Sequence, residues 1–137
     1  MKKQKIIASL VILLIISGFS MKNRATNVQG DVLNEVQVAI KMGSSKELVK
    51  HLNSRIDLII DGDQSTYSNT QAEFVLKDFF KKYPPSDFQY IHKGASKDGL
   101  QYAIGKYSHS GGTFRVVLRS KKFNDAYKIY NLDFTRE

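Results

Sequence analysis

The C-terminal part of the chain alternates between strand-like segments and short turn sequences, and this alternation constrains the fold most. Four segments rich in tyrosine, phenylalanine and β-branched residues span 87–94, 100–108, 113–123 and 126–137. The intervening sequences ASKDG, HSGG and ND carry the glycine, asparagine, aspartate and serine residues that hairpin turns require. Because strands joined by short turns pair antiparallel, this part of the chain is predicted to form a long antiparallel meander.

The segment before this meander shows helical periodicity interrupted by one hairpin. A helix is predicted over 31–42, with an aspartate cap and a glycine stop, and a second over 44–52, which opens with the capping-box spacing S-x-x-E. Residues 56–60 alternate as a strand with one apolar face, and 65–67 form a short return strand. A third helix is predicted over 68–83, because a second capping-box spacing precedes an apolar stripe and two prolines end it.

The order of these elements predicts an α+β fold. A bent helical pair, a hairpin, a third helix and a meander indicate three helices packed on the concave face of a curved antiparallel sheet. The length suits one domain with a real core, which we place at 30–137. The sequence contains no internal repeat, low-complexity segment or interdomain linker.

The N-terminal residues have the pattern of a secretory signal. Lys2, Lys3 and Lys5 precede an apolar run over residues 6–19, which is shorter than the roughly twenty apolar residues of a membrane span. We therefore predict a signal peptide over 1–20, with its cleavage position left open between 20 and 29, and an uncleaved anchor as the alternative. The predicted location is the periplasm or the cell envelope.

Charge and cysteine usage exclude some classes of protein. The net charge of +8 suggests a nucleic-acid partner, but five of the 21 basic residues and no acidic residue precede residue 27. The rest of the chain carries 16 basic and 13 acidic side chains, so the electrostatic argument for nucleic acid largely disappears with the leader. The chain has no cysteine, so neither a disulfide framework nor a lipid-modified cysteine is available.

One loop has the appearance of a metal site. Asp61, Asp63 and Ser65 occupy alternate positions, as in a calcium-binding EF-hand, but the required glycine and glutamate are replaced by Thr66 and Ala72. We interpret the stretch as a hairpin turn followed by a helix cap. The three histidines have no metal-ligand spacing, so we predict neither a metal nor another cofactor.

Aromatic side chains are the remaining functional signal. No nucleophile elbow or phosphate-binding glycine loop is present. Phe88, Tyr90 and His92 alternate along one strand and are predicted to share a face lining the concave side of the sheet. We predict a tyrosine-rimmed apolar pocket, whose candidate lining residues are Tyr90, His92, Tyr102, Phe79 and Tyr83. An aromatic core between helix and sheet is the simpler alternative.

The strand over 113–123 has a second feature. Arg115, Val117 and Arg119 alternate with apolar residues, which predicts a basic outer face against an apolar inner one. Such a face suits an acidic partner or lipid headgroups, and ordinary solvated strand charges explain it equally well.

The runs GSSKELVKHLN, YSNTQAEFVLKDFFKKYPPSDFQYIHKG and DGLQYAIGKYSHSGGTFRV carry a family resemblance. They resemble a family of small exported bacterial proteins, typical of the Bacteroidetes, known as domain of unknown function 4783. That family lies in the nuclear transport factor two-like superfamily, also called SnoaL-like or cystatin-like. The resemblance implies a cone-shaped α+β fold and an envelope location. The steroid isomerases of this superfamily use an acidic and tyrosine trio that does not align here, because no acidic residue falls on an inward-facing strand position.

Two functions follow as hypotheses. The leading one is a non-catalytic envelope module that binds a small apolar ligand or another protein, with a second copy paired through the sheet as one partner. The alternative is a small cofactor-independent lyase, isomerase or hydrolase, in which His92 and a neighbouring tyrosine act inside the cone.

Overall fold

The computed structural model describes residues 28–137, and the side chains from Val32 onward. The predicted signal peptide therefore lies outside the described residues. The elements in chain order are α1 (Val28–Lys41), α2 (Ser45–Val49), β1 (Leu52–Ile60), β2 (Asp63–Ser68), α3 (Asn69–Lys82), β3 (Pro85–Ala95), β4 (Gln101–His109), β5 (Gly112–Phe123) and β6 (Ala126–Arg136).

The helix boundaries follow the predicted caps. Gly43, with φ of 65°, ends α1, and the Ser44 hydroxyl accepts the Glu47 amide hydrogen at 3.2 Å to begin α2. Ser68 and Gln71 form a reciprocal capping box at the start of α3. These contacts confirm the predicted bent helical pair and the predicted start of the third helix.

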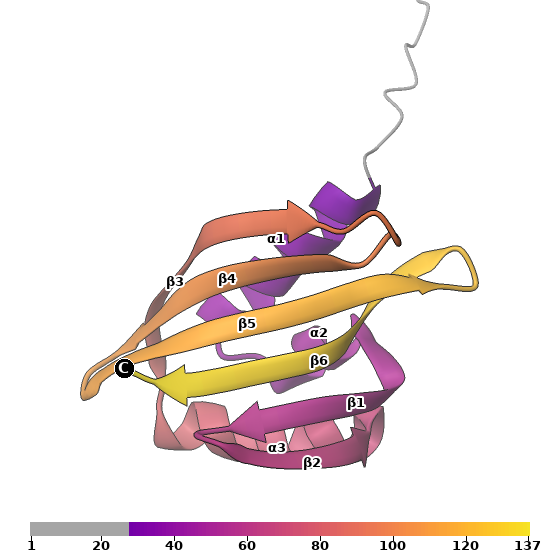
Figure 1. The fold of residues 1–137 in the computed structure, drawn as a ribbon. Coiled ribbons are helices and arrows are strands. Elements are labelled where there is room, and N and C mark those ends of the chain that lie inside the picture. Colours follow the sequence, from indigo (N-terminus) through magenta and orange to yellow (C-terminus); the bar gives the residue numbers. More distant parts are fainter. Residues whose placement is uncertain (1–27) are drawn as a thin grey trace, which may run out of the picture.

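The six strands form one curved sheet in the order β2-β1-β6-β5-β4-β3, which confirms the α+β fold class (Figure 1). Four pairings are antiparallel, but β1 and β6 run parallel, with Leu58 opposite Leu132 and Ile60 opposite Phe134. This pairing differs from the all-antiparallel sheet that was predicted. It joins strands far apart in sequence, so no local turn sequence could indicate it.

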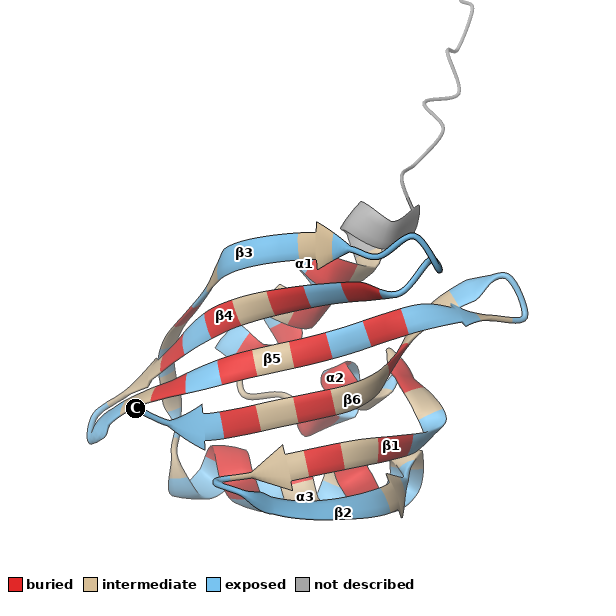
Figure 2. Ribbon diagram, viewed as in Figure 1, coloured by how far each residue is buried: buried red, intermediate tan, exposed pale blue. Residues whose placement is uncertain are grey.

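Side chains alternate between two faces of the sheet, as Figure 2 shows along β4, β5 and β6. One face, called here the inner face, packs against the helices and carries buried residues such as Leu58, Phe114, Leu118 and Leu132. The opposite face, called here the outer face, carries polar and basic residues among a few apolar ones. The helices therefore cover one face of the sheet and leave the other accessible.

The turn between β1 and β2 confirms the hairpin interpretation of the calcium-like loop. Asp61 and Gly62 have φ of 51° and 91°, as a two-residue hairpin turn of type I′ requires. The Asp61 carboxylate accepts the Arg136 backbone amide hydrogen at 3.4 Å and pairs with the Arg136 guanidinium at 3.6 Å. These contacts hold the turn against the end of β6.

None of the helices in residues 28–137 is long and apolar enough to cross a bilayer.

Candidate functional site

The five residues predicted to line one pocket lie on two different faces of the sheet. Phe79, Tyr83 and Tyr90 belong to the inner side, between the helices and the sheet. His92 and Tyr102 lie on the outer face, where the imidazole Nε2 and the phenol oxygen are 2.9 Å apart. The structure therefore brings together two groups of predicted residues and does not form the single predicted pocket.

A β-bulge in β3 causes this separation. Tyr90 pairs with Gly105 and His92 pairs with Ile104, so β3 advances by two residues where β4 advances by one. The extra residue reverses the alternation, and His92 moves to the face opposite to that of Phe88 and Tyr90. The prediction that these three residues share a face is therefore wrong. The hypothesis that placed the His92 imidazole inside the cone is wrong for the same reason.

Aromatic rings occupy the interior between α3 and the sheet. The Phe79 ring lies 4.4 Å from Phe134, 5.2 Å from Phe114 and 5.3 Å from Tyr83, measured between centroids. Burial of the Tyr107 phenol raises its pKa above the usual value, and its hydroxyl donates to the Tyr83 carbonyl. The aromatic core, given above as the alternative to a ligand pocket, describes this region.

Tyr90 is also engaged within the domain. Its hydroxyl donates to the Leu33 carbonyl of α1 at 2.8 Å, and burial raises the pKa of the phenol. Tyr83 lies nearer to solvent, where its hydroxyl accepts from the Arg136 guanidinium at 3.0 Å. With Phe79, it borders a pocket of about 360 Å³ at the end of the domain that carries the β1–β2 turn.

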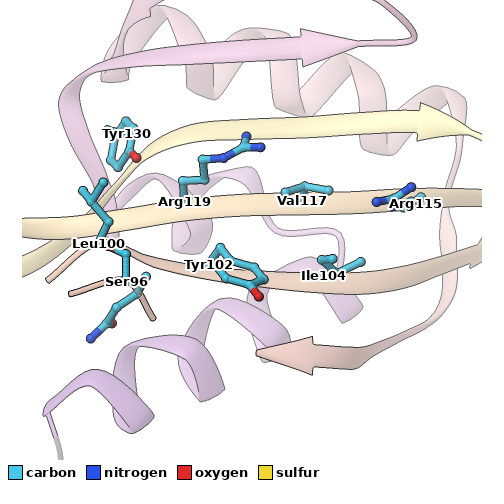
Figure 3. Close-up of a pocket in the computed structure, with 9 residues that line it drawn as sticks. Ser96, Leu100, Tyr102, Ile104, Arg115, Val117, Arg119 and Tyr130 are labelled. Atoms are coloured by element: carbon cyan, nitrogen blue, oxygen red, sulfur yellow. The ribbon is translucent and has the colours of Figure 1, made fainter. Parts of the chain in front are cut away.

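A separate groove of about 400 Å³ lies on the outer face of β4 and β5, and we call it the outer groove (Figure 3). Its floor contains Ile104 and Val117, which are directly paired across the two strands. Tyr102, Arg115 and Arg119 rise around this floor in Figure 3. The complete lining is Ser96, Leu100, Gln101, Tyr102, Ile104, Arg115, Val117, Arg119 and Tyr130.

The charged side chains that line the outer groove are all basic. Two guanidinium groups line it, and its lining includes no acidic side chain. Arg119 donates one hydrogen bond to the Asn131 side-chain oxygen at 2.8 Å, which leaves most of its five donors unused by that bond. Neither arginine takes part in an ion pair with another residue of the described part of the chain.

Tyr102 is positioned by two neighbours on β3. Its ring crosses over Gly94, its cross-strand partner, and its hydroxyl meets the His92 imidazole. A glycine opposite an aromatic residue lets the ring lie flat against the sheet. Tyr102 thereby forms one wall of the outer groove.

The sequence indicated part of this site. The alternation of Arg115, Val117 and Arg119 predicted a basic outer face, and the structure confirms that these three side chains share that face. Ile104 occupies the equivalent outward position of β4 and could have been found by the same period of two. Leu100 and Tyr130 could not, because a turn and a bulge place them.

Chemically, this arrangement suits binding of an anion that carries an apolar part. Arginine presents several donors in a planar fork that fits carboxylate and phosphate oxygens, while Ile104 and Val117 offer an apolar surface. Among residues 28–137, no group of three or more histidine, aspartate or glutamate side chains is placed to hold a metal ion.

Comparison with known proteins relates the chain to solved structures. DUF4783 family proteins from Bacteroides ovatus ATCC 8483 and Bacteroides uniformis ATCC 8492 are each 29% identical to it, with a TM-score of 0.72. The alignments cover 75% and 76% of this chain and 93% and 95% of the two structures. An NTF2-like protein of unknown function from Shewanella baltica OS155 is 12% identical, with a TM-score of 0.63 over 80% of this chain and 91% of that one.

The last similarity shows the fold alone, and it confirms the nuclear transport factor two-like architecture. A search of curated proteins found no match. The family described as a domain of unknown function, DUF4783, matches residues 33–135, so it covers most of the chain and includes every strand that builds the outer groove. The chain belongs to the DUF4783 family.

Proposed function

We propose that the domain is a non-catalytic binding module of the cell envelope, which takes an anionic ligand with an apolar body in the outer groove. The observation that carries this proposal is the composition of the groove. Two arginines flank the paired Ile104 and Val117, and no acidic side chain lines the site. Export to the envelope is part of the proposal and rests on the N-terminal sequence pattern.

The spacing of the arginines sets the shape of the ligand. Arg115 and Arg119 are four residues apart on one strand, which corresponds to about 13 Å between their Cα atoms. Val117 lies between them on the same face. A ligand with one anionic head bound by an arginine would extend its apolar body over Val117 and Ile104. A medium-chain fatty acid has this combination of head and body.

The test uses sodium decanoate below its micellar concentration, with decanol as the uncharged control of equal chain length. We expect decanoate to raise the melting temperature of the protein, because a ligand that binds only the folded state stabilises it. Decanol should raise it much less. In the Arg115→Gln/Arg119→Gln variant the decanoate effect should disappear, whereas Lys77→Gln/Lys81→Gln on α3 should leave it unchanged. Equal shifts with decanol and decanoate would contradict the proposal.

A second copy of the chain is the other candidate for the outer face, and a charge pattern favours it. Asp57 of β1 and Asp133 of β6 lie on one half of this face, while Arg115 and Arg119 of β5 lie on the other. A two-fold axis along the strands between β6 and β5 would lay β6 of one protomer over β5 of its partner. Asp133 would then meet the partner between its two arginines, because Asp133 is paired with Val117 in the register.

Sedimentation velocity separates the two candidates. A dimer weakened by Asp133→Lys and restored by combining it with Arg115→Glu/Arg119→Glu would support pairing through the sheet. If the protein is a monomer at all concentrations and binds decanoate, the ligand is supported as the occupant of the outer face and the second copy is not.

A further inference from the structure

The hairpin that joins β5 and β6 extends beyond the rest of the sheet, as Figure 1 shows. Phe123 pairs with Ala126, so the turn has two residues, Asn124 and Asp125. Both have positive φ, at 49° and 67°, as in a type I′ turn. Three lysines and one acidic residue lie on it, which gives the projecting segment a net positive charge. The three lysines are Lys121, Lys122 and Lys128.

Aromatic rings accompany two of these lysines. The Lys121 Nζ lies 4.9 Å from the Phe123 ring centroid and 5.1 Å from the Tyr130 centroid. The Lys122 Nζ lies 5.6 Å from the Tyr127 centroid. An aromatic body beside a long cationic side chain suits the boundary between water and lipid, where the ring and the alkyl stem enter and the charge stays at the headgroups.

The same end of the domain carries other residues of this kind. The β3–β4 turn lies there and contributes the exposed Leu100, with Lys97 and Asp98 balancing each other in charge. The start of α1 lies there too: the Leu33 carbonyl contacts Tyr90, whereas Lys41 pairs with Asp87 further back along β3. Because α1 runs antiparallel to β3, the chain enters the domain at the end with the hairpins.

The opposite end carries charges of both signs. Asp61 lies in the β1–β2 turn there and Asp63 follows it, Lys82 lines the same pocket as these two carboxylates, and Glu137 ends the chain. Arg136 lies at this end as well, but its guanidinium is engaged by Asp61. The projecting hairpin thus carries three lysines and one aspartate, whereas the opposite end mixes both signs of charge, so a negatively charged surface would attract the hairpin end.

We propose that the β5–β6 hairpin end of the domain docks on an anionic lipid surface. Lys121 and Lys122 contact the headgroups, and Phe123 enters the interfacial layer. An anionic bilayer attracts basic side chains close to its surface, and salt screens this attraction. Aromatic side chains add contacts with the boundary between headgroups and acyl chains. Leu100 and Tyr130 line the outer groove, but none of these three residues does, so changing the three leaves the lining of the proposed ligand site intact.

The test places a single tryptophan at the hairpin of the full chain, which contains no tryptophan of its own. Phe123→Trp is mixed with vesicles of brominated phosphatidylcholine alone, or of brominated phosphatidylcholine and phosphatidylglycerol in equal parts. Phe74→Trp is the matched control, because Phe74 is an exposed phenylalanine on α3. Both variants keep residues 1–27, so any effect of the leader is common to them.

We expect the anionic vesicles to quench the tryptophan at position 123 at least twice as strongly as the one at position 74. High salt should remove the difference, and so should adding Lys121→Glu/Lys122→Glu. The melting temperature of this charge-reversed variant should match that of Phe123→Trp, which shows that it folds.

Equal quenching at the two positions would overturn the proposal, as would quenching that does not depend on phosphatidylglycerol or on the two lysines. A fluorescence change produced by a short RNA oligonucleotide but not by vesicles would also overturn it, because the hairpin would then be a site for polyanions of another class.

Discussion

Tyr102 lies so close over Gly94 that an added methyl group at Gly94 would come within 2.4 Å of the tyrosine ring. The ring is the end of a flexible, partly exposed side chain, so it has room to move. Gly94 therefore positions Tyr102 over the outer groove, and a larger residue at position 94 would displace that wall of the site.

Replacing Gly94 by alanine should accordingly change the groove more than the stability. We expect Gly94→Ala to alter the free energy of unfolding by no more than about 0.5 kcal/mol, as for most surface changes, while weakening decanoate binding. Denaturant titration and thermal shift measure the two effects.

Gly105→Ala is the matched control. A methyl group there would come within 2.5 Å of the buried Phe88 ring and 3.1 Å of the Gln89 carbonyl oxygen, and neither can move freely. Overpacking at such a position costs about 1–3 kcal/mol. Equal losses of stability for the two alanine variants would contradict the assignment of Gly94 to positioning.

Phe79 and Phe74 lie on the same helix and test the aromatic core. Phe79 is 4% exposed at the centre of the ring cluster, whereas Phe74 is 66% exposed. We expect Phe79→Ala to lower the free energy of unfolding by about 3–5 kcal/mol and Phe74→Ala by less than about 0.5 kcal/mol. Chemical denaturation of both variants checks this. A small loss for Phe79→Ala would show that the interior is loosely packed.

His51 should make the stability of the domain depend on pH. Burial lowers the pKa of this imidazole below its usual value of 6.5, and this effect outweighs Glu35, whose carboxylate lies 3.3 Å away and raises the pKa. The folded state therefore binds the proton less readily than the unfolded state. Stability is full above pH 6.5 and falls as the pH decreases through the pKa of the folded protein.

The measurement is the difference between the unaltered protein and His51→Gln in unfolding free energy, followed from pH 8 down to pH 5. We expect the unaltered protein to lose more stability than the variant over this range. A greater loss for the variant would mean that the ion pair with Glu35 dominates, and that the pKa of His51 is raised in the folded state.

Local sequence signals predicted most of the fold. The capping boxes at Ser44 and Ser68 and the glycines and asparagines of the hairpins act within a few residues, so the helices and most strands could be placed from them. The parallel pairing of β1 with β6 could not, because it depends on how distant segments pack.

The site was predicted less well, and a single residue explains much of the difference. The bulge at Ile91 reverses the alternation of β3, so His92 faces outward although a strict period of two places it beside Tyr90. Bulges have no reliable sequence signature. By contrast, β5 keeps its alternation through Arg115, Val117 and Arg119, and there the sequence correctly predicted a basic outer face.

The proposal that the outer groove binds the ligand is tested most directly by NMR of the methyl groups during titration with decanoate. We predict saturable shifts of the Ile104 and Val117 methyl resonances, which vanish in Arg115→Gln/Arg119→Gln. The resonances of Val38 and Met42, which line a separate groove of about 420 Å³ beside α1 and α2, should stay unchanged. Shifts at Val38 and Met42 with none at Ile104 and Val117, or equal shifts in the variant without the two arginines, would contradict the account.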